Sequence, residues 1–234
     1  MTIKENIAIV RAQIAAAAGR VGRDPSQIKL IAVSKKKPAD AVYEAYCEGL
    51  TAFGENYVQE LMQKQESDAL AGVDGLEWHM IGHVQTNKVK YLIGRTALIQ
   101  SLDSVRLAEE IQRQAKKASV IVDVLIEVNV AKEDNKYGFF IEDTQKAAEE
   151  ISGFENIQII GLMTSAPITT NPENNRAYFR QLNELYIDIS RKKIHNTHMR
   201  VLSMGMSGDF EVAIEEGSNM LRLGTRLFGL RETG

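Results

Sequence analysis

Hydrophobic residues near the start of the chain recur at the spacing of an amphipathic helix. Separated by three, four or seven residues, they are Ile3, Ile7, Val10, Ile14 and Val21. Residues at these intervals share one face of a helix that has about 3.6 residues per turn. Thr2 precedes the run and Glu5 follows three residues later, which is typical of a capping box. The pattern predicts a helix that opens the fold.

From residue 28 onward, short β-branched and aliphatic runs alternate with charged segments of helical period. Eight runs are expected to form strands, at residues 28–34, 52–56, 77–83, 97–103, 120–130, 157–166, 199–207 and 220–229. Strands that alternate with helices form parallel sheets, because each helix returns the chain to the start of the next strand. Eight units in 234 residues, without a linker, favour one barrel over an open sheet. We therefore predict a single (β/α)8 TIM barrel domain over residues 1–234, with an extra N-terminal helix.

The composition is that of an ordinary globular protein, with 44% hydrophobic and 25% charged residues. The formal net charge is -3 and the sequence pI is near 5.9, so the chain has no basic excess to bind nucleic acid or anionic lipid. Neither nucleic acid nor a membrane is therefore expected as a partner. No surface stripe is distinctive enough to indicate an interface, and a monomer is expected.

Cysteine usage and the N-terminus bear on the cellular compartment. Cys47 is the single cysteine, which excludes an internal disulfide, and its helical segment predicts a packed, inert thiol. The first residues lack the basic start, apolar core and cleavage site of a signal peptide. No segment approaches the roughly 18 apolar residues of a membrane span. A cytoplasmic location is expected.

Three consecutive lysines follow the first predicted strand, in the segment LIAVSKKKPAD. Side chains alternate between the two faces of a strand, so Lys35 shares the face of Ile31 and Val33, whereas Lys36 faces the other way. If the first face is the barrel interior, the Lys35 amine reaches the mouth where the carboxyl ends of the strands converge. Solvated lysines beside a helix remain the alternative interpretation of this tripeptide.

The last two predicted strands carry polar residues on the face that would point inward. In RVLSMGMSGDF, Ser203 and Ser207 share one face, which leaves room for a ligand and offers it hydroxyl donors. In NMLRLGTRLFG, Arg222 and Gly224 share a face, which places a guanidinium inside the barrel. A buried arginine needs a partner, either an acid such as Glu127 or a bound ligand.

A phosphate site is also expected after the last two strands. Gly224 and Thr225 can supply backbone N–H groups and a hydroxyl to a phosphate dianion. A glycine near a strand is by itself more often a packing feature, but phosphate sites of TIM barrels are frequently built after strands seven and eight. The position of these residues therefore favours phosphate binding.

Other strand ends add polar candidates. Asn56, in FGENYVQE, follows the second predicted strand and could bond a ligand hydroxyl. His79 and His83 share a face of the third predicted strand, where a structural hydrogen-bonding role remains the alternative for both. No set of Cys, Asp and His residues has the spacing of metal ligands, so no metal is expected.

These groups match the needs of pyridoxal 5′-phosphate (PLP). The lysine amine can form an imine with it, the small cradle can donate to its phosphate, and the arginine can be the partner of its ring nitrogen. An aldolase that forms an imine with a sugar phosphate would use the first two, and it remains an alternative. A cation beside the ring nitrogen disfavours protonation of that nitrogen, which makes the ring a poorer electron sink.

At these residues the chain resembles the pyridoxal phosphate homeostasis proteins, a family similar to the N-terminal domain of alanine racemase and also called YggS-type. The matching segments are LIAVSKKKP, FGENYVQE, WHMIGHVQTNKVK, GLMTSAP and LSMGMSGDFEVAIEEGSNMLRLGTRLFG. They span nearly the full length and occur in the family's order.

The resemblance implies a barrel like the first domain of alanine racemase, with PLP held as an internal aldimine on Lys35. It also implies that Ser207, Gly224 and Thr225 bind the phosphate and that Arg222 faces the ring nitrogen. The residues that it implies for the pocket wall are Asn56, His83 and Ser203.

Proteins similar to this one are regarded as carriers or buffers of PLP in vitamin B6 homeostasis rather than as enzymes. PLP-dependent apoenzymes are the candidate recipients of the cofactor. A racemase or decarboxylase is the alternative, but racemases that resemble alanine racemase add a second β-domain with a catalytic tyrosine. This chain ends at Gly234, a few residues after its eighth predicted strand, so robust amino-acid racemase activity is not expected.

Overall fold

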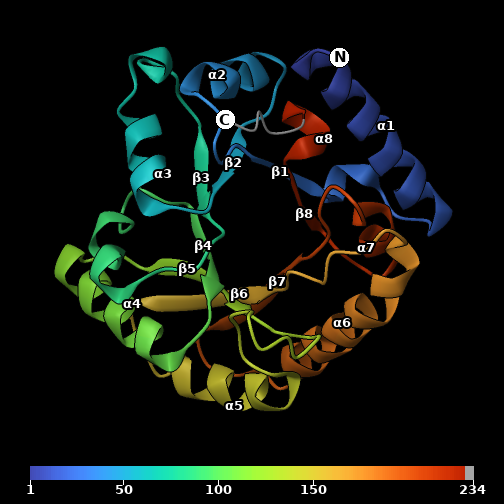
Figure 1. Ribbon diagram of the computed structural model, residues 1–234. Coiled ribbons are helices and arrows are strands. Elements are labelled where there is room, and N and C mark those ends of the chain that lie inside the picture. The colour runs from blue at the N-terminus through green and yellow to red at the C-terminus, as the bar shows by residue number, and fades with distance from the viewer. Residues whose placement is uncertain (230–234) are drawn as a thin grey trace.

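The structure, a computed structural model, describes residues 1–229 and contains a closed barrel of eight parallel strands inside a layer of helices (Figure 1). In chain order the strands are β1 Lys29–Val33, β2 Ala52–Glu55, β3 Glu77–Met80, β4 Leu98–Leu102, β5 Val122–Glu127, β6 Ile157–Met163, β7 Thr197–Ser203 and β8 Met220–Leu223. Strand β1 pairs with both β2 and β8, so the sheet closes without a free edge. The prediction of a (β/α)8 TIM barrel is confirmed.

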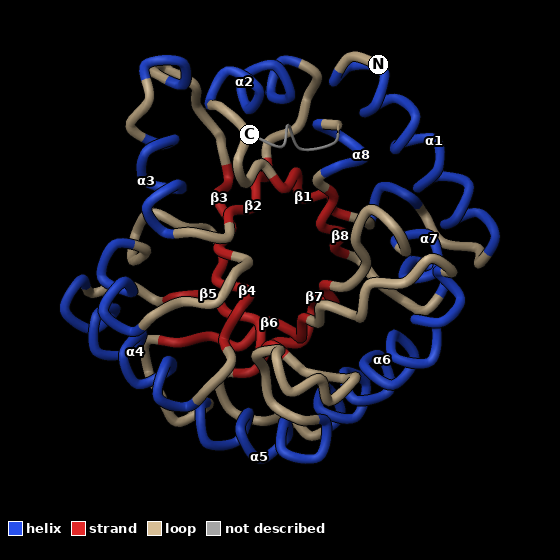
Figure 2. The backbone as a smooth tube through the Cα atoms, in the orientation of Figure 1, coloured by secondary structure: helices blue, strands red, loops and turns tan. Residues whose placement is uncertain are grey.

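Helices form the outer ring of the molecule and strands the inner ring (Figure 2). The α-helices are α1 Ile3–Arg20, α2 Ala39–Cys47, α3 Val58–Gln65, α4 Val105–Ala118, α5 Ile141–Ile151, α6 Arg176–Arg191, α7 Phe210–Glu215 and α8 Thr225–Phe228. Short 3-10 helices are η1 Pro25–Gln27, η2 Asp68–Leu70, η3 Thr86–Tyr91 and η4 Pro172–Asn175. In the part of the chain that the structure describes, no helix combines the length and the apolar character needed to cross a membrane.

The predicted N-terminal helix and its capping box are both present. Thr2 Oγ1 accepts a hydrogen bond from the Glu5 N–H at 3.2 Å, and Glu5 Oε2 accepts one from the Thr2 N–H at 2.8 Å. Helix α1 packs against α7 and α8, and Asn6 Nδ2 donates to the Leu227 carbonyl at 2.9 Å. The first helix is thereby joined to the last described helix.

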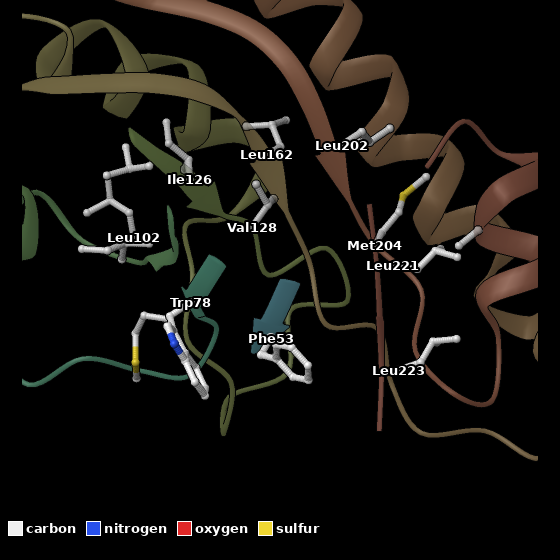
Figure 3. Close-up of a cluster of buried hydrophobic side chains, with 14 of the residues drawn as sticks. Phe53, Trp78, Leu102, Ile126, Val128, Leu162, Leu202, Met204, Leu221 and Leu223 are labelled. Atoms are coloured by element: carbon white, nitrogen blue, oxygen red, sulfur yellow. The ribbon is translucent and has the colours of Figure 1, made fainter. Parts of the chain in front are cut away.

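Two sets of buried side chains lie on opposite faces of the barrel wall. The larger set fills the space between strands and helices and includes Phe53 and Trp78, whose ring centroids are 5.8 Å apart (Figure 3). The smaller set contains Ile31, Ala52, Leu98, Leu125, Ile160, Met163 and Met220. Ala32 belongs to the larger set while its neighbour Ile31 belongs to the smaller one. The face of β1 that carries Ile31 is therefore the barrel interior, which is the condition under which Lys35 was expected to reach the mouth.

The seventh strand is shorter than its sequence predicts. Strand β7 ends at Ser203, whereas residues up to 207 were expected to continue it. Gly205 has a φ of 95°, which extended L-residues do not adopt, and a Cβ there would lie 2.6 Å from Ala213 Cβ. The chain therefore leaves the sheet and passes close to α7.

The eighth strand is also shorter, and the prediction of a strand over 220–229 was wrong in its second half. Strand β8 ends at Leu223, and the N–H groups of Leu227 and Phe228 donate to the Gly224 carbonyl at 2.9 Å each. These bonds begin α8. A four-residue segment such as TRLF fits a strand and a helix turn equally well, so the sequence pattern did not separate the two.

Cys47 is exposed, so the prediction of a packed thiol was wrong. The buried face of α2 carries Val42 and Ala45. Each residue advances a helix by about 100°, which turns position 47 away from that face.

Candidate functional site

A pocket of about 490 Å³ opens where the carboxyl ends of several barrel strands converge. Its walls come from the ends of β1 and β8 and from the segments that follow β1, β2, β3, β6, β7 and β8. Six of the eight predicted site residues line it, namely Lys35, Asn56, Ser207, Arg222, Gly224 and Thr225. The expected convergence of strand ends on one mouth is present, as the fold class requires.

The three consecutive lysines have three different surroundings. Lys35 is partly buried and lines the pocket. Lys36 is exposed, has a φ of 61°, and donates its backbone N–H to Glu60 Oε1 at 2.5 Å. Lys37 donates its Nζ to the Phe228 carbonyl at 3.0 Å. The inward direction predicted for Lys35 thus distinguishes it from both neighbours.

Behind Lys35, on the outer face of the barrel wall, lies a buried network of charged groups. Glu55 Oε1 accepts hydrogen bonds from Ser34 Oγ and from Lys64 Nζ, both at 2.6 Å, and Lys64 Nζ also donates to Glu60 Oε1 at 2.9 Å. Burial raises the pKa of Glu55, and the charge of Lys64 opposes that rise. Because Lys64 Nζ also donates to the Ser34 carbonyl at 2.6 Å, the network fixes the backbone next to Lys35.

Arg222 brings a buried guanidinium to the pocket wall. Its strand β8 pairs with β1 so that Arg222 is the partner of Ile31, and only 4% of the residue is exposed. One terminal nitrogen donates to Ser203 Oγ and the other to the Thr164 carbonyl, both at 2.6 Å. Burial lowers the pKa of Arg222 to about 10, so the side chain is still a cation at neutral pH.

Glu127 was expected as one possible partner of Arg222, and its influence is exerted at longer range. Among the described residues, no carboxylate forms an ion pair with Arg222, although the charge of Glu127 raises the pKa of the guanidinium. Burial raises the pKa of Glu127 to about 7, and the charge of Asp103 adds to the shift. The direct partners of Arg222 are therefore neutral oxygens, and the remaining side of the guanidinium borders the pocket.

Backbone donors converge on an oxygen at the junction of β8 and α8. Ser207 Oγ accepts hydrogen bonds from the N–H groups of Gly224 at 3.3 Å and Arg226 at 3.4 Å. Thr225 is exposed beside them. A Cβ at Gly224 would lie 3.3 Å from the Val33 carbonyl, so the absence of a side chain lets this junction approach β1. The arrangement gathers two backbone N–H groups at the Ser207 hydroxyl oxygen, next to Thr225 on the pocket wall.

Asn56 and His83 lie at the ends of neighbouring strands but in different surroundings. Asn56 lines the pocket, and the chain after β3 passes so close that a Cβ at Gly82 would lie 2.5 Å from the Asn56 carbonyl. His83 is exposed and does not belong to the pocket wall. Its Nδ1 lies 2.5 Å from Asp103 Oδ2, and its ring stacks on Tyr137 with centroids 3.7 Å apart.

Ser203, the remaining predicted residue, is fully buried and lies behind Arg222 rather than on the pocket wall. Its hydroxyl accepts from Arg222 and donates to Gln100 Oε1 at 2.6 Å. Any effect of Ser203 on a ligand would therefore act through Arg222.

The segment after β6 was not assigned to the site, yet it forms one wall. Ser165, Pro167, Ile168 and Thr169 line the pocket, and Ile168 is 96% exposed. Small polar residues directly after a strand, as in TSAP, are the signal that would have indicated them. This wall gives the pocket an apolar edge.

Asp209 lines the pocket as well and was also missed. It is buried, and its two carboxylate oxygens accept from the Met206 N–H at 2.7 Å and from Asn175 Nδ2 at 2.8 Å. The carboxylate thus holds the loop after β7 in place. Across residues 1–229, no cluster of three or more His, Cys, Asp or Glu side chains is arranged to hold a metal ion.

Comparison with known proteins identifies the family. The model of the family described as alanine racemase, N-terminal domain, matches residues 3–232. The pyridoxal phosphate homeostasis protein of Aquifex aeolicus is 47% identical, and the match covers 99% of this chain and all of that protein. The chain belongs to the pyridoxal phosphate homeostasis protein family. A second member of the family, from Pseudomonas aeruginosa, is 41% identical over all of this chain and 97% of its own length.

Solved structures agree with this membership. PipY of Synechococcus elongatus, solved with PLP bound, is 33% identical with a TM-score of 0.84, and the match covers 97% of this chain and all of PipY. Alanine racemase of Clostridium difficile has a TM-score of 0.74 at 16% identity, and the match covers 99% of this chain and 57% of the racemase. The second likeness shows a shared barrel only. The family identified here is the one that the sequence motifs indicated.

Proposed function

We propose that this protein binds PLP as an internal aldimine on Lys35 and takes part in intracellular PLP homeostasis, buffering or delivering the cofactor without robust catalysis of its own. The observation that carries the proposal is one pocket in which a lysine side chain, a convergent set of N–H and hydroxyl donors and a buried guanidinium meet. The PLP bound to PipY supports the same ligand for this relative.

The donors of the pocket fit the parts of PLP. Ser207, Gly224 and Thr225 would hold the phosphate, because N–H donors already converge on a hydroxyl oxygen at this junction. Arg222 would face the ring nitrogen, and Asn56 would contact the ring substituents from the wall after β2. His83 and Ser203 lie behind or beside this wall and would act through their neighbours. When bound, PLP supplies an electrophilic aldehyde and an electron-withdrawing ring.

Arg222 also favours storage over turnover. A guanidinium has hydrogen-bond donors only, so it holds the ring nitrogen as an acceptor and disfavours its protonation. An unprotonated pyridine withdraws electrons weakly, which slows chemistry that needs a carbanion. Among the described residues that line the pocket, the titratable side chains are Lys35, Asp209 and Arg222. Both oxygens of Asp209 already accept hydrogen bonds, so this pocket wall offers no second base opposite Lys35 for racemisation.

The wider role follows from the same proposal. We place the protein in the cytoplasm as a single-domain monomer over residues 1–234, and PLP-dependent apoenzymes are the proposed recipients of the cofactor. Nucleic acid and membranes are not proposed as partners, since the chain has a formal net charge of -3.

The experiment that tests the proposal is visible absorbance of the purified protein before and after PLP is added, followed by borohydride reduction and peptide mass mapping. We expect a yellow protein with phosphopyridoxyl on Lys35, no trapped label in Lys35→Ala, and normal labelling in the matched control Lys36→Ala. No colour after PLP is added would overturn the proposal, and a label confined to Lys36 or Lys37 would overturn the assignment of the lysine.

The same preparation separates the alternatives. A sugar-phosphate aldolase should remain colourless and yield a borohydride-trapped imine with its substrate instead. A robust racemase rate from the pure, PLP-loaded protein would contradict the proposed lack of catalysis.

A further inference from the structure

A row of hydrogen bonds crosses the interior of the barrel beneath the pocket. His79 on β3, Gln100 on β4, Ser203 on β7 and Arg222 on β8 follow one another, with separations of 2.9 Å, 2.6 Å and 2.6 Å. All four are buried, and His79 is only 1% exposed. The row connects a histidine deep inside the barrel to the guanidinium on the pocket wall.

The chemistry of the donors fixes the direction of every bond in the row. A guanidinium only donates, so Ser203 Oγ accepts from Arg222, and the Ser203 hydroxyl proton is left for Gln100 Oε1. Gln100 then directs its Nε2 to His79 Nδ1, which must accept. The same Gln100 nitrogen lies 3.3 Å from the thioether of Met220, a weak acceptor. The opposite amide orientation would leave the Ser203 proton without an acceptor.

The tautomer of His79 follows from this direction. With Nδ1 as acceptor, the imidazole carries its proton on Nε2, which lies 3.7 Å from Glu77 Oε2 and has no hydrogen-bond partner. Glu77 pairs with Lys29 at the amino ends of β3 and β1, opposite the pocket. Burial and the charge of Lys29 lower the pKa of His79 to about 4, so the ring stays neutral and Nδ1 stays an acceptor at neutral pH.

This polar row is costly in a barrel interior otherwise filled by aliphatic side chains. A buried amide and a buried imidazole each lose hydration, and hydrogen bonds to partners of fixed direction offset that loss. Without Gln100 as an acceptor, the Ser203 hydroxyl would be free to rotate its proton towards Arg222. The row prevents this, because it keeps a lone pair of Ser203 Oγ directed at the guanidinium.

We infer that His79 and Gln100 are positioning residues for Arg222. Through Ser203, they hold the guanidinium in the orientation that presents an N–H donor to a planar ring-nitrogen acceptor in the pocket. The inference rests on the proposed function, because PLP is the ligand that supplies such an acceptor. The proposed function assigns ligand contacts to the pocket wall, whereas this inference assigns part of the ligand selection to His79 and Gln100, which do not touch the ligand.

The test compares PLP with its carbocyclic analogue, in which a C–H group replaces the ring nitrogen. We expect His79→Leu to raise the Kd for PLP roughly tenfold, the size of one lost hydrogen bond, and to change the Kd for the analogue less than twofold. His79→Asn keeps an acceptor near the position of Nδ1 and is expected to restore PLP affinity to within about threefold of the unmodified protein. His198→Asn, at an exposed histidine, is the matched control.

The outcomes separate this inference from the proposed function. If the unmodified protein binds neither ligand, the proposed function fails. If it binds PLP but His79→Leu weakens PLP and the analogue equally, or weakens neither, the positioning role is overturned and PLP binding stands. Gln100→Met, which keeps the side-chain length without a strong donor or acceptor, gives the same comparison should His79→Leu fail to fold.

Discussion

At the scale of single residues, Glu127 and Arg222 are both shifted towards their neutral forms by burial. The pKa of Glu127 is raised to about 7 and that of Arg222 is lowered to about 10. The two charges favour each other without a direct ion pair. At neutral pH the guanidinium therefore remains charged while Glu127 is divided between its protonated and ionised forms. The net charge inside the barrel mouth changes close to neutral pH.

Glu127 makes folding depend on pH with a definite sign. Its folded pKa of about 7 exceeds the reference value of 4.5, so the folded state retains a proton that the unfolded chain releases, and stability falls as pH rises between these values. We expect Glu127→Gln to increase the free energy of unfolding at pH 8 by roughly 1 to 3 kcal/mol and to change it little at pH 4.5. Urea unfolding of the apoprotein at both pH values measures this.

The matched control for that prediction is Glu142→Gln. Glu142 is exposed and pairs with Lys132 on the surface, so its removal should change the free energy of unfolding by less than about 0.5 kcal/mol. An equal effect of Glu127→Gln at the two pH values would contradict the role of burial at Glu127.

At the scale of elements, the contact between β6 and β7 decides which groups meet Arg222. The register shifts between Ile159 and Gly161, and beyond the shift Met163 pairs with Ser203. Thr164 follows directly, and its N–H donates to the Ser203 carbonyl at 3.1 Å. The Thr164 carbonyl and Ser203 hydroxyl thereby lie side by side as acceptors for one guanidinium.

Gly161 is required for this shift. A Cβ at Gly161 would lie 1.8 Å from the Val201 carbonyl oxygen, which no rotamer change can relieve. We expect Gly161→Ala to separate β6 from β7 and to lower the free energy of unfolding by roughly 3 kcal/mol or more. Denaturant unfolding measures the loss. Gly19→Ala, in α1 with no atom within 4 Å of the added Cβ, should instead gain about 0.5 to 1 kcal/mol. A small effect at Gly161 would show that the strands tolerate separation.

These elements show what the sequence could and could not predict. Alternation along a strand predicts that Lys35 shares a face with Ile31, and Arg222 with Gly224, because it depends on local chain geometry only. Which face is the interior depends on how the barrel packs. The partners of Arg222 depend on barrel closure and on a register shift, neither of which leaves a periodic pattern. The wall formed by residues 165–169 was missed because a loop has no period, and α8 because a four-residue turn is too short to show one.

At the scale of the whole molecule, His79 and Glu127 give the folding equilibrium opposite dependences on pH. The folded pKa of His79, about 4, lies below its reference value of 6.5, so the unfolded chain binds a proton that the folded barrel excludes. The stability that the neutral ring contributes is present above pH 6.5 and is lost as the pH falls towards 4. Glu127 acts in the opposite direction over much of the same range. The barrel therefore contains two titratable groups, the buried His79 and the half-buried Glu127, whose effects offset each other in mild acid.

Replacing either group should expose the effect of the other. We compare the free energy of unfolding of His79→Asn with that of the unmodified protein. As the pH falls from 7 to 4, we expect the variant to gain up to roughly 3 kcal/mol relative to the unmodified protein. Over the same fall in pH, the difference in free energy of unfolding between Glu127→Gln and the unmodified protein should become smaller. Unfolding at pH 4, 5, 6 and 7 measures both slopes. A pH-independent difference for His79→Asn would mean that the buried ring is not the source.

Pairing of β1 with β8 has a consequence for protein synthesis. The ribosome makes Lys35 long before Arg222, and the strands that precede Lys35 and carry Arg222 become neighbours only when β8 joins β1. Such a contact between distant parts of the chain is slow to form. A nascent chain therefore carries the lysine without the walls after β7 and β8 until those strands have been made. The pocket is complete only once β8 has joined β1 and the ring has closed.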